Sequence, residues 1–377
     1  MIIRSIILSI FSMVILSGNA QMTIVLDRVP QLTPLFEELY YSGTYNNWNR
    51  GDWQSVFEKK DGVYSMTITA EENSKQEFYV NRGNDETNAS KADGSYIDPF
   101  VFTYKKGATL HITIEGWRDM PGNHTVTKNV FILSNHFQMD SLKRHRRIWI
   151  CLPNNYYTED KTYPVIYMQD GQNLFDQASA FTSEWHIDET MLAMNDTVQQ
   201  SIIIGIDNGG STRMEEYSFY PNPKYNFEAQ GMNYADFIIN NLKPFIDINF
   251  HTQSERESTF IGGSSLGALI SAFIAIENPE VFSGALLFSP AYWFNQELFE
   301  IAMFHEFNRT YRIYQVASQL EDNGTVVKDM MDFDGYLKST PNDIIQINSV
   351  TREYGAHSEW FWDKEFGEAY IWLMADF

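Results

Sequence analysis

The 377-residue chain contains a single cysteine, Cys151, so no disulfide can form within one chain. Basic residues are also few, since 27 lysines and arginines stand against 49 acidic residues, a formal net charge of −22. This charge argues against nucleic acid and anionic membrane surfaces as partners. Cys151 lies in the apolar run RRIWICLP, which predicts a buried thiol rather than a reactive one.

Long hydrophobic runs are absent from the sequence after its first 20 residues. Within them, the basic start Met1–Arg4 precedes an apolar run, Ser5–Leu16, and small residues follow up to Ala20. This order predicts a signal peptide, residues 1–20, cleaved near Ala20. The run is too short to span a bilayer, so we expect no membrane anchor. Export without disulfides indicates a secreted or periplasmic bacterial protein.

Residues 21–126 contain short alternating runs separated by clusters of Asn, Gly and Asp. Strands are predicted near 38–49, 62–70, 76–83 and 109–117. With no helical period between them, the pattern predicts an all-β, immunoglobulin-like sandwich domain. The Pro- and Gly-containing stretch RDMPGNHTVTKN then predicts a linker.

Residues 127–377 alternate between strand-like and helix-like segments. Strands are predicted at 129–134, 146–153, 162–169, 201–207, 258–263, 284–289, 311–318 and 344–354, and helices at 233–250, 266–277 and 326–339. Alternating β and α units predict an α/β domain whose mostly parallel sheet is covered by helices on both faces.

One short segment of this domain carries a catalytic motif. Residues 263–267 read Gly-Ser-Ser-Leu-Gly, a G-x-S-x-G pattern between the predicted strand and the helix that begins at Leu266. A serine on such a strand-turn-helix is the nucleophile elbow of the α/β-hydrolase fold, and the glycines let the backbone turn tightly. The alternative is a flexible loop entering a helix. The context favours Ser265 as a nucleophile.

A serine hydroxyl needs an imidazole base that is oriented by a carboxylate. Only His305 and His357 lie downstream of Ser265. His305 falls in AMFHEFN, which we interpret as a helix face, whereas His357 follows a predicted strand in a glycine-containing loop. Such loops hold the active sites of parallel sheets, so His357 is the predicted base. Glu321 and Asp322, which follow another strand, are the candidate acids.

The oxyanion of an acyl-transfer reaction also needs hydrogen-bond donors. The backbone N–H of Leu266 is the first candidate, and a second is expected from the loop after the strand YPVIYMQ. We predict the Gln172 amide, although its neighbours are equally compatible. The sequence has no H-E-x-x-H or C-x-x-C cluster and no phosphate-binding loop, so no metal or other cofactor is predicted.

Five segments together resemble the esterase D family of α/β-hydrolases, which includes enterochelin esterases and feruloyl esterase domains. They are YPVIYMQDGQNLFD, IGIDNG with RMEEYS, YADFIINNLKPFID, FIGGSSLGALIS and GAHSEWFW, and the likeness extends over about 130–377. The resemblance implies Ser265 as nucleophile and His357 as base, and it selects Glu321 over Asp322. Ser318 stands where this family usually has glycine, and Leu266 and Ala268 where Met and Gly are common.

The first domain is similar to the early-set and starch-binding-like sandwiches that precede some of these esterases, through YYSGTYNNWNRGDW and DGVYSMTITA. In such modules a pair of aromatic side chains stacks on sugar rings. Trp48 and Trp53 are the candidates here, and a structural role for them is the alternative.

The sequence therefore predicts an exported serine esterase that acts through an acyl-enzyme on carbohydrate-linked acetyl or feruloyl esters. The alternatives are an enterochelin-like siderophore esterase, a peptidase on the same fold, and a non-catalytic glycan-binding protein on a hydrolase scaffold. The expected partner is a small-molecule or polysaccharide ester. The oligomeric state does not follow from the sequence.

Overall fold

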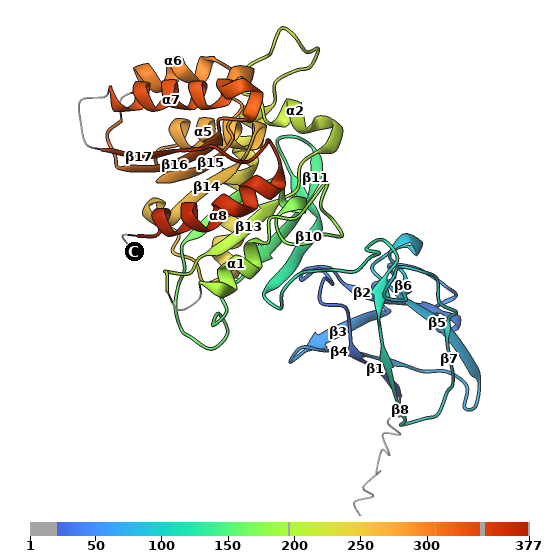
Figure 1. The fold of residues 1–377 in the computed structure, drawn as a ribbon. Coiled ribbons are helices and arrows are strands. Elements are labelled where there is room, and N and C mark those ends of the chain that lie inside the picture. The colour runs from blue at the N-terminus through green and yellow to red at the C-terminus, as the bar shows by residue number, and fades with distance from the viewer. Residues whose placement is uncertain (1–20, 195–196, 306, 340–343, 376–377) are drawn as a thin grey trace, which may run out of the picture. The chain divides into compact units, whose positions relative to one another are not determined.

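The computed structural model describes residues 21–194, 197–305, 307–339 and 344–375. The predicted signal peptide, residues 1–20, lies outside the described residues. The chain forms two compact units, which divide at Pro30, Glu38 and Pro121. Unit 1 runs up to Pro30 and from Glu38 to Pro121, and unit 2 comprises Gln31–Glu37 and everything from Gly122 onward (Figure 1). Within the described ranges, no helix has the length and apolar character that a membrane crossing requires.

Unit 1 consists, in its described part, of strands and short 3-10 turns. Its seven-stranded sheet has the order β7-β5-β2-β3-β4-β1-β8, and β6 pairs with β9. The bounds are β1 Met22–Arg28, β2 Leu39–Gly43, β3 Val56–Lys60, β4 Val63–Ile68, β5 Lys75–Asn81, β6 Ala89–Ser90, β7 Phe100–Thr103, β8 Thr109–Thr113 and β9 Gly116–Trp117. Alternate side chains along β1 and β4 are buried, as expected of strands with one face on a core.

The two candidate sugar-stacking tryptophans of unit 1 differ in exposure. The Trp53 side chain is 78% exposed. Trp48 is half-buried, and its ring centroid lies 6.1 Å from that of Tyr79. The all-β content fits the predicted domain class, while its kinship to carbohydrate-binding modules stays a prediction.

Unit 2 is built on an eight-stranded sheet with the order β10-β11-β13-β12-β14-β15-β16-β17. The bounds are β10 Val130–Met139, β11 Arg144–Cys151, β12 Val165–Gln169, β13 Ile202–Ile206, β14 Thr259–Ser264, β15 Gly284–Phe288, β16 Tyr311–Ser318 and β17 Ile345–Arg352. The β10–β11 and β11–β13 pairs are antiparallel and the rest are parallel. Every residue of β12 to β15 is buried, because helices cover both faces of this sheet. All eight predicted strands are present.

The helices of unit 2 are α1 Ile187–Ala193, α2 Arg213–Glu216, α3 Gly231–Asp236, α4 Lys243–Asn249, α5 Leu266–Glu277, α6 Glu297–Phe304, α7 Thr325–Lys338 and α8 Glu359–Leu373. Figure 1 shows α5, α6 and α7 on one side of the sheet and α1 and α8 on the other. The helix predicted over 233–250 is interrupted by a π-helical stretch, Phe237–Leu242. His305 follows the last residue of α6, so placing it within a helix was wrong by one residue.

Candidate active site

Ser265 occupies a sharp turn between β14 and α5. Its φ of 57° and ψ of −122° are sparsely populated by residues with a side chain, so the surrounding structure must impose them. The Ser265 N–H donates to the Phe288 carbonyl at 2.9 Å, and its own carbonyl accepts from Leu269 and Ala291, both at 3.1 Å. These three bonds anchor the strained residue to β15 and α5.

The two glycines of the G-x-S-x-G motif permit close packing against the end of β12. A Cβ at Gly263 would lie 2.9 Å from the Gln169 side chain, and a Cβ at Gly267 would lie 2.9 Å from Asp170 Oδ2. Both contacts are shorter than real Cβ atoms make. The motif therefore brings the serine turn directly against the loop that follows β12.

His357 bridges the serine and the acid. Its Nε2 lies 2.8 Å from Ser265 Oγ, and its Nδ1 lies 2.8 Å from Glu321 Oε2. An ionised Glu321 only accepts hydrogen bonds, so Nδ1 carries the proton and Nε2 is left to accept from the serine hydroxyl. The three side chains come from the carboxyl ends of β14, β16 and β17, which share one edge of the sheet.

The structure places Glu321, not Asp322, against the histidine. Glu321 is 3% exposed, and its Oε1 accepts from the Ser318 amide at 2.8 Å and the Ser289 hydroxyl at 2.9 Å. The Asp322 side chain is exposed to solvent. Three donors around a buried carboxylate hold Glu321 in a single orientation toward His357.

Ser318 also takes part in this arrangement. Its buried Oγ accepts from the Leu320 amide at 3.1 Å and donates to the Gly355 carbonyl at 3.4 Å. Gly355 has a φ of +102°, and a Cβ there would meet the Phe361 ring at 2.3 Å. The serine thus links the acid loop to the histidine loop.

Two residues that support the acid were not predicted from the sequence. Trp362 Nε1 donates to Ser289 Oγ at 2.8 Å, and Ser289 in turn donates to Glu321. The Trp362 ring also packs edge-to-face on the His357 ring, with centroids 5.2 Å apart. The sequence carried one signal for Ser289, which is its position directly after β15. This strand is the neighbour of β14, which leads to Ser265.

We expect Ser289→Ala to lower kcat about tenfold while KM changes less than about twofold. The variant removes one donor to the Glu321 carboxylate, and a hydrogen bond to a charged group contributes about 1.5–3 kcal/mol, part of which reaches the transition state. Ser283→Ala is the matched control, because Ser283 precedes β15 whereas Ser289 follows it, and its hydroxyl donates to the Glu257 carbonyl. Steady-state kinetics of both variants checks this, and equal kcat values would contradict it.

The predicted oxyanion donors are the amides of Leu266, which follows Ser265 in the chain, and Gln172, which lines the same cavity as Ser265. Leu266 is the first residue of α5, so its N–H has no acceptor within the helix. Gln172 lies in the 3-10 turn Gly171–Asn173 that follows β12. In the described ranges, neither amide donates to another protein group. Both are therefore available to a substrate oxygen.

Asp170 anchors the loop that carries Gln172. Its carboxylate accepts from Arg213 Nε at 2.7 Å and Nη2 at 2.8 Å, and from Asn208 Nδ2 at 2.7 Å. The Asn208 amide donates to Gln172 Oε1 at 3.0 Å. Burial alone would lower the pKa of Arg213, but the Asp170 carboxylate outweighs it and the pKa is raised above its usual value. The Asp170–Arg213 ion pair holds the loop in place.

A cavity of about 500 Å³ opens over the catalytic side chains. Its walls include Ser265, His357, Arg213, Trp362 and Phe181, and the Phe181 side chain is 85% exposed. The cavity thus joins the reactive serine to an aromatic face that an acyl or alcohol group could contact. This volume suits a small-molecule group rather than a whole polymer.

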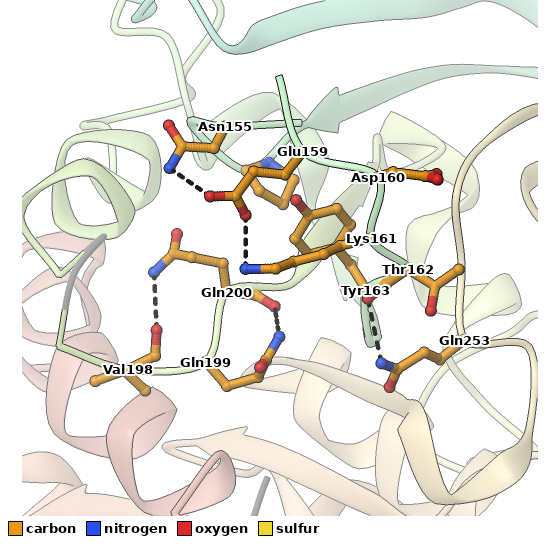
Figure 2. A pocket seen from close by; sticks show the side chains of 11 residues that line it. Asn155, Glu159, Asp160, Lys161, Thr162, Tyr163, Val198, Gln199, Gln200 and Gln253 are labelled. Carbon is orange, nitrogen blue, oxygen red and sulfur yellow. Dashed lines mark hydrogen bonds and ion pairs between the residues drawn. The ribbon is translucent and has the colours of Figure 1, made fainter. Parts of the chain in front are cut away.

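A larger cavity, of about 580 Å³, lies at the opposite edge of the sheet, beside the starts of β12 and β13 (Figure 2). Its polar side chains largely satisfy one another. Glu159 binds Asn155 at 3.3 Å and Lys161 at 2.7 Å, and Gln253 donates to the Thr162 carbonyl at 3.2 Å (Figure 2). None of the predicted catalytic residues lines it. The smaller cavity is therefore the candidate active site.

The sheet order fits the α/β-hydrolase fold, and the strained Ser265 lies within hydrogen-bond distance of His357 at the candidate site. The sequence family described as "Putative esterase" matches residues 139–372, and the chain belongs to this family.

Comparison with individual proteins shows distant similarity. The chain is 29% identical over 168 residues to the uncharacterized protein YbbA of Bacillus subtilis, a match that covers 41% of this chain and 62% of YbbA, less than two thirds of that relative. A ferulic acid esterase structure aligns with a TM-score of 0.53 at 14% identity, covering 68% of this chain and 100% of its own. The enterobactin esterase FES of Shigella flexneri aligns with a TM-score of 0.53 at 16% identity, covering 89% and 88%. At these identities the structures share the fold.

Proposed function

We propose that this protein is an exported serine esterase that hydrolyses carboxylic esters through an acyl-enzyme. The observation that carries the proposal is His357, which lies 2.8 Å from both Ser265 Oγ and Glu321 Oε2. Such a spacing is what proton transfer from a serine nucleophile requires. An intact set of three also argues against a non-catalytic glycan-binding protein that keeps the fold only as a scaffold.

The geometry supports a two-stage reaction. Ser265 Oγ attacks the ester carbonyl carbon and gives its proton to His357 Nε2, while Glu321 stabilises the imidazolium. The amides of Leu266 and Gln172 donate to the oxyanion. The intermediate collapses, and His357 returns the proton to the departing alcohol. Water, deprotonated by His357, then attacks the acyl-enzyme and releases the carboxylic acid and Ser265.

Export is the second part of the proposal and rests on the order of basic, apolar and small residues in 1–20. We expect protein recovered from the periplasm or the medium to begin at Gln21, as intact-mass and N-terminal peptide mass spectrometry would show. Recovery of residues 1–20 in a membrane fraction would contradict cleavage.

Carbohydrate-linked acetyl or feruloyl esters are the first substrate candidates. The net charge of −22 slows the approach of polyanionic esters but not of neutral ones. Phe181, exposed at the cavity wall, offers a face on which an aromatic acyl group can stack, and Trp53 in unit 1 offers one for a sugar ring. The fold likeness to a ferulic acid esterase points the same way.

Catecholate siderophore esters are the second candidate. The alignment with the enterobactin esterase covers 89% of this chain, whereas that with the ferulic acid esterase covers 68%. The former must therefore include much of unit 1. A catechol ring would use the same aromatic face at Phe181.

The test is a comparison of kcat/KM on acetyl-xylan fragments, feruloyl-arabinose and a triserine catecholate ester. We expect the carbohydrate esters to be preferred, and Ser265→Ala to be inactive on each. Trp53→Ala should weaken retention on insoluble polysaccharide without changing kcat on a soluble ester. A preference of more than about tenfold for the siderophore ester, about 1.4 kcal/mol, would reverse the ranking.

A further inference from the structure

Three carboxylates of unit 2 converge where α1 begins. Glu184 and Asp188 are 1% and 0% exposed, and Glu189 is half-buried. One oxygen of each lies within 4.8 Å of the oxygens from the other two. None of the three takes part in the Ser–His–Glu arrangement, so the reaction proposed above does not explain their burial.

Four buried oxygens at this place have no hydrogen-bond partner within the described ranges. Three belong to the carboxylates: Glu184 Oε1, Asp188 Oδ1 and Glu189 Oε2. The fourth is the hydroxyl Oγ1 of Thr127, which lies on a separate segment after the linker. The Thr127 amide donates to Asp188 Oδ2 at 2.7 Å, which brings this residue against the Asp188 carboxylate. A buried oxygen without a partner costs about 1–3 kcal/mol, so the unpaired oxygens of the buried Glu184 and Asp188 indicate a missing partner.

The surroundings supply little positive charge. No lysine or arginine in the described part of the chain forms an ion pair with these three carboxylates. His186 Nε2 lies 3.9 Å from Glu184 Oε2, but its Nδ1 also faces Asp363 at 3.6 Å. The nearby Cys151 is a buried thiol, as predicted. Burial raises the pKa of this thiol, and the charges of Asp188 and Glu189 raise it further. Burial raises the pKa of Asp188 to about 7. The Thr127 amide lowers this pKa, and Glu189 raises it.

We propose that Glu184, Asp188, Glu189 and the Thr127 hydroxyl bind a divalent cation, with Ca²⁺ as the fitting ion. All four donors are oxygens, which hard cations prefer over the nitrogen and sulfur ligands of zinc sites. Two ligands of one Ca²⁺ ion with bonds of about 2.4 Å are at most about 4.8 Å apart, and the carboxylate oxygens of the cluster lie within that limit. Mg²⁺ usually keeps several waters and takes one or two carboxylates, so three carboxylates favour Ca²⁺.

The cation site is structural and separate from the catalytic steps. Glu184 follows Phe181 and Thr182, which line the catalytic cavity. The next residue, Trp185, packs its ring on Trp362 with centroids 5.5 Å apart. A bound cation would therefore stabilise one wall of the active site and hold the segment around Thr127 to the start of α1.

The test is calcium binding and thermal unfolding of the full mature chain after chelation and removal of the chelator. At pH 8, saturating Ca²⁺ should raise the Tm of the wild type by about 5 °C or more, the shift expected when free ion exceeds Kd about a hundredfold. Mg²⁺ should raise it less, and elemental analysis should find about one Ca²⁺ per chain. Asp188→Asn and Glu184→Gln keep the side-chain shape and remove a charge, so both should fold and lose most of the shift.

Asp160→Asn is the control, because Asp160 is an exposed carboxylate of the polar cavity in Figure 2 and should leave the Ca²⁺ response unchanged. The proposal would be overturned if Ca²⁺ did not change the Tm of the wild type and no ion were retained. A proton shared between Asp188 and Glu189 would then explain the cluster. A full shift in Asp188→Asn would also overturn it, because the ion would then bind elsewhere. Neither readout depends on esterase activity, so the proposed function can stand or fall separately.

Discussion

Ser265→Ala is expected to lower kcat by about 10⁴-fold or more with little effect on folding. The serine oxygen lies 2.8 Å from His357 Nε2, and without this nucleophile the proposed acyl-enzyme cannot form. The residual rate would come from the oxyanion donors and substrate binding alone. Alanine at this position keeps the same backbone demand as serine, since both carry a Cβ at φ 57°. Circular dichroism and steady-state kinetics on a chromogenic ester check both points.

A fluorophosphonate probe separates Ser265 from its neighbour. Ser264 is the last residue of β14 and is 4% exposed, whereas Ser265 Oγ faces the histidine. The probe should modify Ser265 in the wild type and in Ser264→Ala, and should modify nothing in Ser265→Ala. An adduct that peptide mapping locates on Ser264 would overturn the assignment.

Glu321→Gln is expected to lower kcat by about 10³–10⁴-fold, whereas Asp322→Asn should stay within about twofold of the wild type. The amide of glutamine cannot stabilise the imidazolium, and it can present an N–H to Nδ1 that selects the wrong histidine tautomer. Asp322 is the matched control, one residue away, exposed and not bonded to His357. KM should change little in either variant, because neither side chain lines the catalytic cavity.

The comparison has a clear contrary outcome. Equal losses of kcat in the two variants, or a larger loss in Asp322→Asn, would contradict the assignment of Glu321 as the acid. A loss of secondary structure in Glu321→Gln would point to the buried bonds from Ser318 and Ser289 instead, and circular dichroism distinguishes this from a catalytic defect.

Local sequence pattern was sufficient for the elements that carry the site. The strands of unit 2 are apolar runs that must be buried on both faces, so the pattern marks them directly, as β12 and β13 illustrate. Ser265 lies in a five-residue motif, and the close packing around its two glycines leaves no room for a side chain. The motif can therefore be found in the sequence alone. His357 followed from chain order and from its place after a strand, because parallel strands bring their carboxyl ends to one edge.

Helices α1, α2 and α8 were not predicted, and α6 was anticipated only around its last residues, in AMFHEFN. In α8 the buried residues recur at helical spacing, but the exposed apolar side chains Trp360 and Ile371 on the other face blur that pattern in the sequence. Residues 31–37 were predicted to belong to the first domain, residues 21–126. In the structure they belong to unit 2, because the amides of Leu35 and Phe36 donate to carbonyls of β10. Such pairing between distant segments leaves no periodicity in the sequence that could reveal it.

The sequence by itself determined the α/β fold of the larger unit, the serine and the histidine, because each depends on short-range pattern and on the direction of the strands. The residue pattern alone left two adjacent carboxylates open, the family resemblance implied Glu321, and the tertiary structure places Glu321 against His357. Asp322 and Asn323 adopt left-handed conformations, with φ of 46° and 54°, and Asp322 lies in solvent while Glu321 lies buried against His357. The supports at Ser289 and Trp362, and the carboxylates near Thr127, likewise come from segments far apart in the chain. Their chemistry exists only where packing excludes water and brings those segments into contact.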